Sequence, residues 1–177
     1  MIRTLSICVL DSNRASAATE FVHTFYSALQ SARHTVSSFY ATTVSSILFN
    51  GNAVADGASV QEIFVNQMPH ATYEVQSYDC QIINANYATP GAEPPAAPGP
   101  SRRHGGGGAA AVAAKKMSLL VLVSGYVRFG EDKQTWDTAA NRGFSETFVL
   151  IPNPESGQKG RGKRQFLIQS QNFRLVV

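Results

Sequence analysis

Residues 117–129, MSLLVLVSGYVRF, carry the pattern that does most to define the fold. Alternate side chains are apolar, as in a β-strand that buries one face, at Leu119, Val121, Val123 and Val127. The intervening positions nevertheless hold Leu120, Leu122 and Tyr126. An antiparallel sheet usually leaves one face in water, so two apolar faces indicate a cover beyond the helices of the same domain. We expect that cover to be a protein partner, because a sandwich interior would need more strands than the chain offers.

Three further extended patterns accompany this stretch, at residues 72–83, 143–151 and 164–177. Residues 131–133, EDK, and residues 153–157, NPESG, supply turn chemistry between the last three of the four strands. Asn50 and Gly51 follow a short apolar run and favour a two-residue hairpin turn, because both tolerate positive φ. The second half of the chain therefore predicts an antiparallel sheet.

Helical periodicity precedes the long strands. Residues 16–30 place apolar side chains at helical spacing, at Phe21, Val22, Phe25, Tyr26 and Leu29. Residues 36–40 carry a second, shorter pattern of the same kind. Ser59 and Glu62 have the spacing of a capping box, and Pro69 blocks continuation of the third helix. Helices followed by strands predict the α+β class.

Residues 88–116 separate these two halves and have a different composition. They contain five of the eight prolines and six of the 14 glycines, and they lack the apolar residues that would offset their ordering entropy. We predict a disordered insertion, because neither flank has a core of its own. The chain is accordingly predicted to be one domain, 1–177, with residues 1–15 as a flexible N-terminal extension.

The formal net charge of +3 is concentrated in two places. Residues 88–116 hold four basic residues and one acidic residue. A second basic cluster consists of Lys159, Arg161, Lys163 and Arg164. Outside this cluster and residues 88–116, the chain has 7 basic and 11 acidic residues. Glycines between these charges would let the side chains follow a phosphate backbone, which predicts non-specific, salt-sensitive RNA contact. No aromatic residue lies inside the cluster to stack on bases. The alternative is a solvated hairpin loop.

Long apolar segments, cysteine pairs and metal-ligand motifs indicate the cellular compartment and the cofactors of a protein. No stretch reaches the roughly 18 apolar residues of a membrane helix, so no membrane partner is expected. Cys8 and Cys80 cannot build a disulfide framework, which favours nucleus or cytosol, with a secretory signal at residues 5–17 as the weaker alternative. We predict no metal and no cofactor, because ligand spacing is missing among Cys8, Cys80, His23, His34, His70 and His104.

A pocket enzyme would need a carboxylate or histidine base with a polar partner in an enclosed site. The candidate side chains are His23, His34, His70, Tyr73 and Asp79. Asp79 falls in mid-strand and alternates in phase with Tyr73, so it is the one charged residue expected on that face. No paired acid accompanies it, so we expect a structural, hydrogen-bonded Asp79 and no catalysis. An isomerase or dehydratase remains the alternative.

Four short motifs together resemble the nuclear transport factor 2-like family. They are FVHTFYSAL at 21–29, LFNG at 48–51, GFSETFVL at 143–150 and QNFRL at 171–175. The resemblance spans about residues 16–87 and 117–177. It implies a cone of three helices packed on a curved antiparallel sheet. The long insertion departs from the compact members, such as the homodimeric carrier of the GTPase Ran. In this respect the chain is similar to the mRNA transport regulator family, the small subunits of fungal nuclear mRNA-export receptors.

This resemblance implies a function as well as a fold. It implies a non-catalytic subunit that heterodimerises, sheet to sheet, with the homologous domain of the large receptor subunit. The pair would carry messenger ribonucleoprotein through the nuclear pore by touching phenylalanine-glycine nucleoporins, and would shuttle between nucleus and cytoplasm. A homodimeric import carrier of the same fold is the alternative.

The final strand predicts where the partner binds. Phe173 and Leu175 share one face, and Arg174 points to the other. If the Phe173 face packs under the helices, Arg174 faces the partner and needs a carboxylate there. The predicted interface residues are Arg174, Leu120, Leu122, Tyr126, Ile168 and Asn172.

Overall fold

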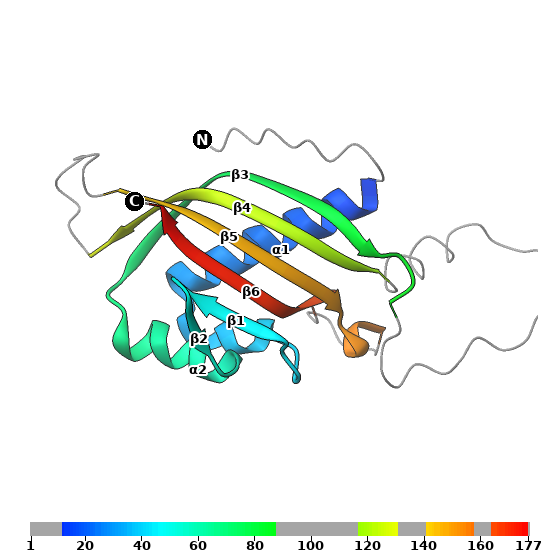
Figure 1. The fold of residues 1–177 in the computed structure, drawn as a ribbon, viewed down its shortest axis with the longest axis horizontal. Coiled ribbons are helices and arrows are strands. Elements are labelled where there is room, and N and C mark those ends of the chain that lie inside the picture. The colour runs from blue at the N-terminus through cyan, green and yellow to red at the C-terminus, as the bar shows by residue number, and fades with distance from the viewer. Residues whose placement is uncertain (1–11, 88–116, 131–140, 158–163, 177) are drawn as a thin grey trace, which may run out of the picture.

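The computed structural model describes residues 12–87, 117–130, 141–157 and 164–176 (Figure 1). Helical segments come first and the long strands follow, as the sequence predicted. In chain order the elements are α1 Ser12–Ser31, η1 Arg33–Phe39, β1 Ser46–Phe49, β2 Asn52–Val54, α2 Gly57–Glu62, η2 Ile63–Gln67, β3 Ala71–Asn84, β4 Ser118–Phe129, β5 Arg142–Pro152, η4 Pro154–Gly157 and β6 Phe166–Val176. No helix within these ranges is long and apolar enough to cross a membrane.

The strands form a six-stranded sheet in the order β2-β1-β6-β5-β4-β3. The turn at Asn50 and Gly51 has positive φ at both residues and closes the β1–β2 hairpin, as predicted. The hairpin then pairs with β6, and β1 and β6 run parallel. The sheet is therefore mixed and not wholly antiparallel, because β1 docks on a strand that is distant in the sequence.

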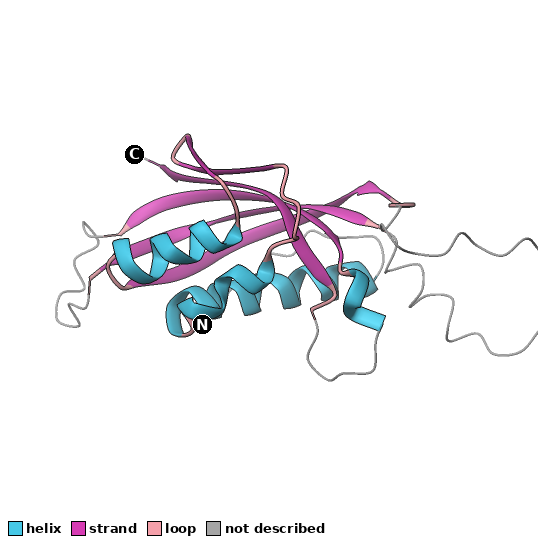
Figure 2. Ribbon diagram, turned by 90° about the horizontal axis from the view of Figure 1, so that it is seen from below, coloured by secondary structure: helices cyan, strands magenta, loops and turns pink. Residues whose placement is uncertain are grey.

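The helices cover one side of this curved sheet. Figure 2 shows α1 and the shorter helices together on one side, with no helix of the described residues on the other. We call the uncovered side the outer face. This arrangement confirms the predicted α+β fold of three helices on a curved sheet, and it leaves the outer face open.

Aromatic rings fill the space between the helices and the sheet. Phe21 and Phe25 of α1 each lie edge to face against Phe148 of β5, with ring centroids 5.1 Å apart. Phe39 of η1 packs edge to face on Phe25 at 5.3 Å. Phe25 and Leu29 are at most 2% exposed. The interior is thus a packed core, which is the filling expected of a scaffold and not of an enclosed enzyme pocket.

Two helix boundaries differ from the sequence prediction. α1 begins at Ser12, so the last part of the predicted flexible extension is helical. The third helix is capped by Asp56 and not by Ser59: the Asp56 carboxylate accepts the Ser59 N–H at 2.7 Å. This hydrogen bond lowers the pKa of Asp56. The short α2 then continues as the π-helix η2.

A β-bulge in β6 corrects one predicted interface residue. Val149 pairs with Ser170, but the next residue of β5, Leu150, pairs with Ile168, so Gln169 is the extra residue. A bulge of one residue exchanges the two faces of a strand. Ile168 consequently points toward the helices and is 0% exposed. It belongs to the core and not to the outer face.

The Arg33 guanidinium ties the C-terminal end of α1 to the end of η2. Its nitrogens donate to the backbone carbonyls of Leu29 at 3.1 Å, Phe64 at 2.8 Å, Met68 at 3.1 Å and Pro69 at 2.8 Å. A cation there also complements the negative ends of both helices. One side chain thus satisfies four carbonyl groups.

We expect Arg33→Met to lower the free energy of unfolding by about 2–3 kcal/mol, because three partly buried acceptors and one exposed acceptor lose their donor together. Urea denaturation measures this loss. Arg142→Met is the control, since Arg142 is exposed at the start of β5. Equal stability of the two variants would contradict the structural role of Arg33.

Candidate partner interface

Strand register arranges the outer face in rows of side chains. Residues paired across neighbouring strands point to the same side of the sheet. One row crosses five strands and consists of Asp79, Leu122, Thr147, Asn172 and Leu48. A second row consists of Ser77, Ser124, Ser145 and Arg174, and a third of Glu74, Tyr126, Gly143 and Val176. We refer to these as the central, serine and tyrosine rows.

Large apolar side chains on this face are exposed. Leu122 is 41% exposed, Tyr126 is 47% exposed and Val176 is 58% exposed. These three belong to the central and tyrosine rows, so they cluster on one side of the sheet. A grouped apolar patch on an open sheet face is typical of a surface that binds another protein.

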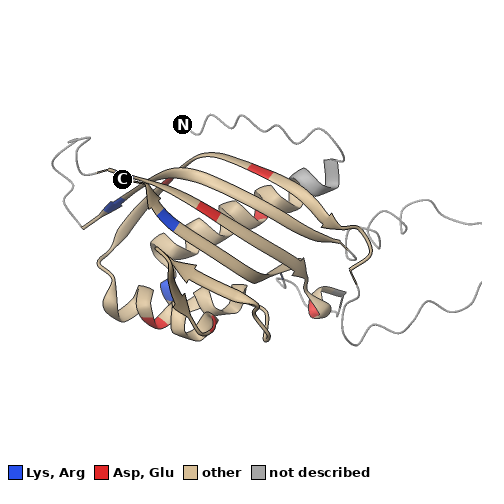
Figure 3. Cartoon of the chain, viewed as in Figure 1, with Lys and Arg blue, Asp and Glu red and all other residues tan. Residues whose placement is uncertain are grey.

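Arg174 stands on the outer face, as the alternation of β6 predicted. Its side chain is exposed and passes close to the β1–β2 turn, 3.9 Å from where a Cβ on Gly51 would lie. No ion pair joins it to a carboxylate within the described ranges. Figure 3 shows that charges are sparse on the long strands, with a basic position on β6 and acidic positions on β3 and β5; the acid of β5 is Glu146, which is 1% exposed. Arg174 is therefore available to an acidic group of a partner.

Asn172 lies near the middle of the same face. Its Oδ1 atom is buried and accepts no hydrogen bond in the part of the chain that the structure describes. A buried acceptor without a donor destabilises the isolated domain by about 1–3 kcal/mol. A donor supplied from outside the sheet would remove this cost.

The outer face has the features of an interface, and comparison of the chain with known protein families shows which family it belongs to. The family model for the nuclear transport factor 2 (NTF2) domain matches residues 17–175. The chain belongs to the NTF2 domain family.

Individual relatives agree with this assignment. NTF2-related export protein 1 of Bos taurus is 28% identical over 134 residues, which are 76% of this chain and 71% of the relative. A solved chain from "Chaetomium thermophilum Mex67 NTF2-like domain complexed with Mtr2" is 25% identical, with a TM-score of 0.69 over 93% of this chain and 99% of that one. "Structure of Mtr2" has a TM-score of 0.67 at 24% identity, covering 93% of this chain and 99% of the other. The relatives thus include a protein named for export and chains from solved structures that contain Mtr2.

Within this NTF2 domain the sequence analysis missed a buried carboxyl group. Glu146 of β5 is 1% exposed, and Tyr26 Oη and Gln171 Nε2 both donate to it at 2.5 Å. Tyr40 Oη donates in turn to the Gln171 carbonyl. Burial raises the pKa of Glu146 to about 7, although both hydrogen bonds act in the opposite direction. The signal was present in the sequence, because Glu146 alternates with Phe144 and Phe148.

The five catalytic candidates do not form a site with this carboxyl. Asp79 belongs to the outer face, where its Oδ1 accepts the Cys80 N–H at 2.8 Å. His23, His34 and His70 are exposed, and only Tyr73 lies inside, where its ring packs on Tyr26. Glu146 is surrounded by these rings, by Phe144 and by Gln171. The arrangement suits a structural polar cluster that joins α1 and η1 to the sheet.

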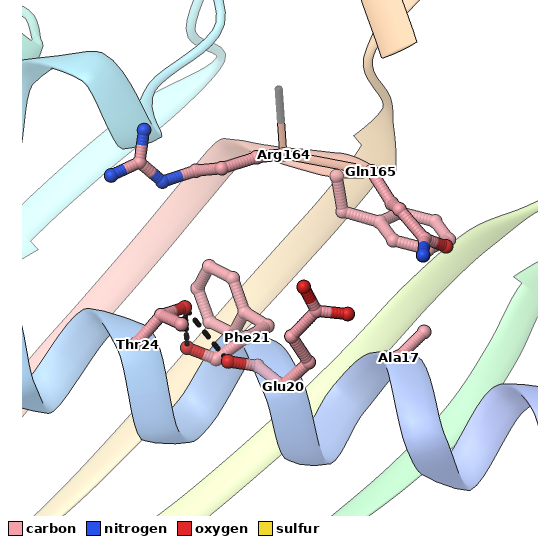
Figure 4. Close-up of a pocket in the computed structure, with 7 residues that line it drawn as sticks. Ala17, Glu20, Phe21, Thr24, Arg164 and Gln165 are labelled. Atoms are coloured by element: carbon pink, nitrogen blue, oxygen red, sulfur yellow. Dashed lines mark hydrogen bonds between the residues drawn. The ribbon is translucent and has the colours of Figure 1, made fainter. Parts of the chain in front are cut away.

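The predicted RNA-contact cluster is only partly described. Lys159, Arg161 and Lys163 lie outside the described residues. Arg164 is folded against the helices: its Cζ lies 3.5 Å from the centroid of the Phe39 ring, and its Nη1 donates to Ser38 Oγ at 3.0 Å. Partial burial lowers its pKa. Arg164 also lines a hollow of about 360 Å³ against Glu20 and Phe21 of α1 (Figure 4). Its guanidinium therefore has a structural role.

Proposed function

We propose that this chain is the non-catalytic small subunit of a nuclear mRNA-export receptor. In this role the outer face binds the NTF2-like domain of the large subunit, and the heterodimer carries mRNA ribonucleoprotein through the nuclear pore. The observation that carries the proposal is the uncovered sheet face with Leu122, Tyr126 and Val176 exposed. The similarity to a chain from a Mex67 NTF2-like domain–Mtr2 complex supports a heterodimer and supports this partner.

The packed interior favours a binding function over catalysis. Phe21, Phe25 and Leu29 occupy the space between α1 and the sheet that a substrate would need. Glu146, the group best suited to acid–base chemistry, is enclosed by hydrogen bonds to Tyr26 and Gln171. The proposal therefore assigns no substrate, metal or cofactor to this NTF2 domain.

Further parts of the proposal concern the path of the heterodimer. It would contact phenylalanine-glycine nucleoporins, shuttle between nucleus and cytoplasm, and touch RNA non-specifically. The proposal keeps residues 1–177 as one domain, with residues 88–116 as an insertion. The family resemblance and the basic cluster at 159–163 support these parts.

The interface is tested by placing a charge on the outer face. We expect Leu122→Glu to weaken binding to the large-subunit NTF2-like domain at least tenfold, because an apolar contact is replaced by a desolvated carboxylate. Val65→Glu is a matched control: Val65 is 45% exposed but lies on η2, on the helical side of the sheet. Isothermal titration measures both affinities. Equal affinities for both variants would overturn the proposed interface, and a symmetric homodimer in sedimentation would favour the import carrier.

RNA contact is tested with the three basic residues that precede Arg164. Replacing Lys159, Arg161 and Lys163 by serine should weaken RNA binding of the heterodimer and flatten its salt dependence, because fewer phosphates are neutralised. Partner affinity should not change. Arg164→Ser should instead lower stability, since it removes the contact with Phe39. An unchanged salt slope in the triple variant would contradict the RNA contact.

A further inference from the structure

A hollow interrupts the outer face at the junction of β3, β4 and β5. It measures about 480 Å³, and its lining includes Ser77, Asp79, Leu122, Ser124 and Ser145. Two features create it. The register of β3 on β4 shifts between Val75 and Ser77, and the serine row places three short side chains side by side on neighbouring strands. The longer side chains of the tyrosine and central rows border this row.

The hollow combines three kinds of surface. Its polar base includes the Ser77 and Ser124 hydroxyl groups, which lie 2.7 Å apart and form a hydrogen bond. Its apolar wall is Leu122, which is 41% exposed. Its charged wall is the Asp79 carboxylate, whose Oδ1 is fixed by the Cys80 N–H at 2.8 Å. The other carboxylate oxygen has no hydrogen-bond donor within the described ranges.

A long basic side chain matches this combination. Lysine and arginine pack their aliphatic stems against apolar surface and keep a cationic head for a polar or acidic group. A charge-assisted hydrogen bond to a carboxylate is about twice as strong as a neutral one. Leu122 would contact the stem, and Asp79 and the serine hydroxyls would accept from the head.

The position of Arg174 identifies the source of that side chain. Arg174 ends the serine row on β6, beside Ser145 of the hollow, whereas Asp79 lies on β3, three strands away in the sheet. In a two-fold dimer of identical chains each contact occurs twice, and two homologous sheets that pack with approximate two-fold symmetry bring corresponding positions together in the same way. If Arg174 meets a carboxylate on the partner strand that corresponds to β3, the reverse contact brings a partner base toward Asp79 on β3 of this chain. The outer face thus carries both halves of a reciprocal charge pattern.

We propose that the hollow receives a lysine or arginine side chain from the sheet of the partner subunit, and that Asp79 determines which partner is accepted. This inference rests on the proposed function, because it assumes a homologous partner on the outer face. It assigns Asp79 a role in specificity, where the sequence had indicated a structural one. It also gives a role to the three short side chains of the serine row, Ser77, Ser124 and Ser145.

The test measures the affinity of full-length variants for the purified large-subunit NTF2-like domain by titration calorimetry. Asp79→Asn, which keeps the shape, should weaken binding at least tenfold and reduce the salt dependence of the affinity. Ser145→Leu, which fills the hollow, should weaken binding to a similar extent. Glu62→Gln is the control, since it removes an exposed carboxylate from α2 on the helical side. Thermal melting of each variant checks that the fold is retained.

The outcomes separate this inference from the proposed function. If the wild-type chain binds the domain and both Asp79→Asn and Ser145→Leu lose affinity, the result supports a basic side chain in the hollow. If the wild-type chain binds the domain and Asp79→Asn binds it with the same affinity, the inference is overturned, but the proposed heterodimer still stands. A wild-type chain that fails to bind the domain overturns both.

Discussion

Arg174→Glu is expected to abolish heterodimerisation. Arg174 is exposed on the outer face, and within the described ranges it has no carboxylate partner of its own. Covering it with another sheet removes water from the guanidinium, so the partner must supply an acidic group. Removing one member of such a desolvated pair costs about 2–5 kcal/mol, and reversing the charge adds repulsion. The affinity measured by titration should fall by at least about 30-fold.

Two further variants make this result specific. Arg142→Glu makes the same charge change on the same sheet, but position 142 alternates with Phe144 and Glu146, which point toward the helices. We expect it to leave the affinity unchanged within a factor of about three, as for a charge outside an interface. Replacing the opposing acid of the partner by arginine should partly restore binding to Arg174→Glu. Equal affinities of wild type and Arg174→Glu would place Arg174 at a solvated rim and contradict the prediction.

The fold could be predicted for those segments in which apolar residues follow one helical or strand spacing throughout. The alternation in residues 117–129 gave the two faces of β4, and the spacing of Phe21, Phe25 and Leu29 gave the buried face of α1. Asn50 and Gly51 gave the hairpin, because positive φ is a local property. Pairing of the hairpin with β6 could not be predicted, since it depends on which distant strand offers a free edge.

The candidate site was predictable to the same extent. Arg174, Leu122 and Tyr126 lie on the outer face as the alternation required. Ile168 does not, because the extra residue Gln169 exchanges the faces and bulges leave no clear mark in a single sequence. Arg164 appeared to belong to a basic loop, and only the tertiary structure shows its guanidinium on Phe39. Simple alternation along β3 predicted that Asp79 would share a face with Tyr73, toward the helices. The bulge at Gln76 exchanges the two faces of the strand and places Asp79 on the outer face.

Glu146 leads to the second large effect, a loss of stability with rising pH. Burial raises the pKa of this carboxyl to about 7, whereas an ordinary glutamate has a pKa of 4.5. Between these two values the folded chain keeps a proton that the unfolded chain has released. The folded state therefore binds more protons, and the free energy of unfolding falls as the pH rises from about 4.5 to about 7. The shift corresponds to a loss of about 3 kcal/mol, which is complete above pH 7.

Glu146→Gln should remove this pH dependence. A glutamine keeps an acceptor for Gln171 Nε2. Its amide nitrogen can donate to the Tyr26 oxygen, which reverses the hydrogen bond that Tyr26 Oη donates to Glu146 but keeps the two groups in contact. We expect urea denaturation of the wild-type chain to give a lower free energy of unfolding at pH 8 than at pH 5, with a markedly smaller difference in the variant. All other titrating groups are shared by the two proteins, so the difference between their pH slopes belongs to Glu146. Parallel slopes would show that the carboxyl ionises in the folded chain as it does in the unfolded one, and Glu146 would then be an ionised carboxylate at neutral pH.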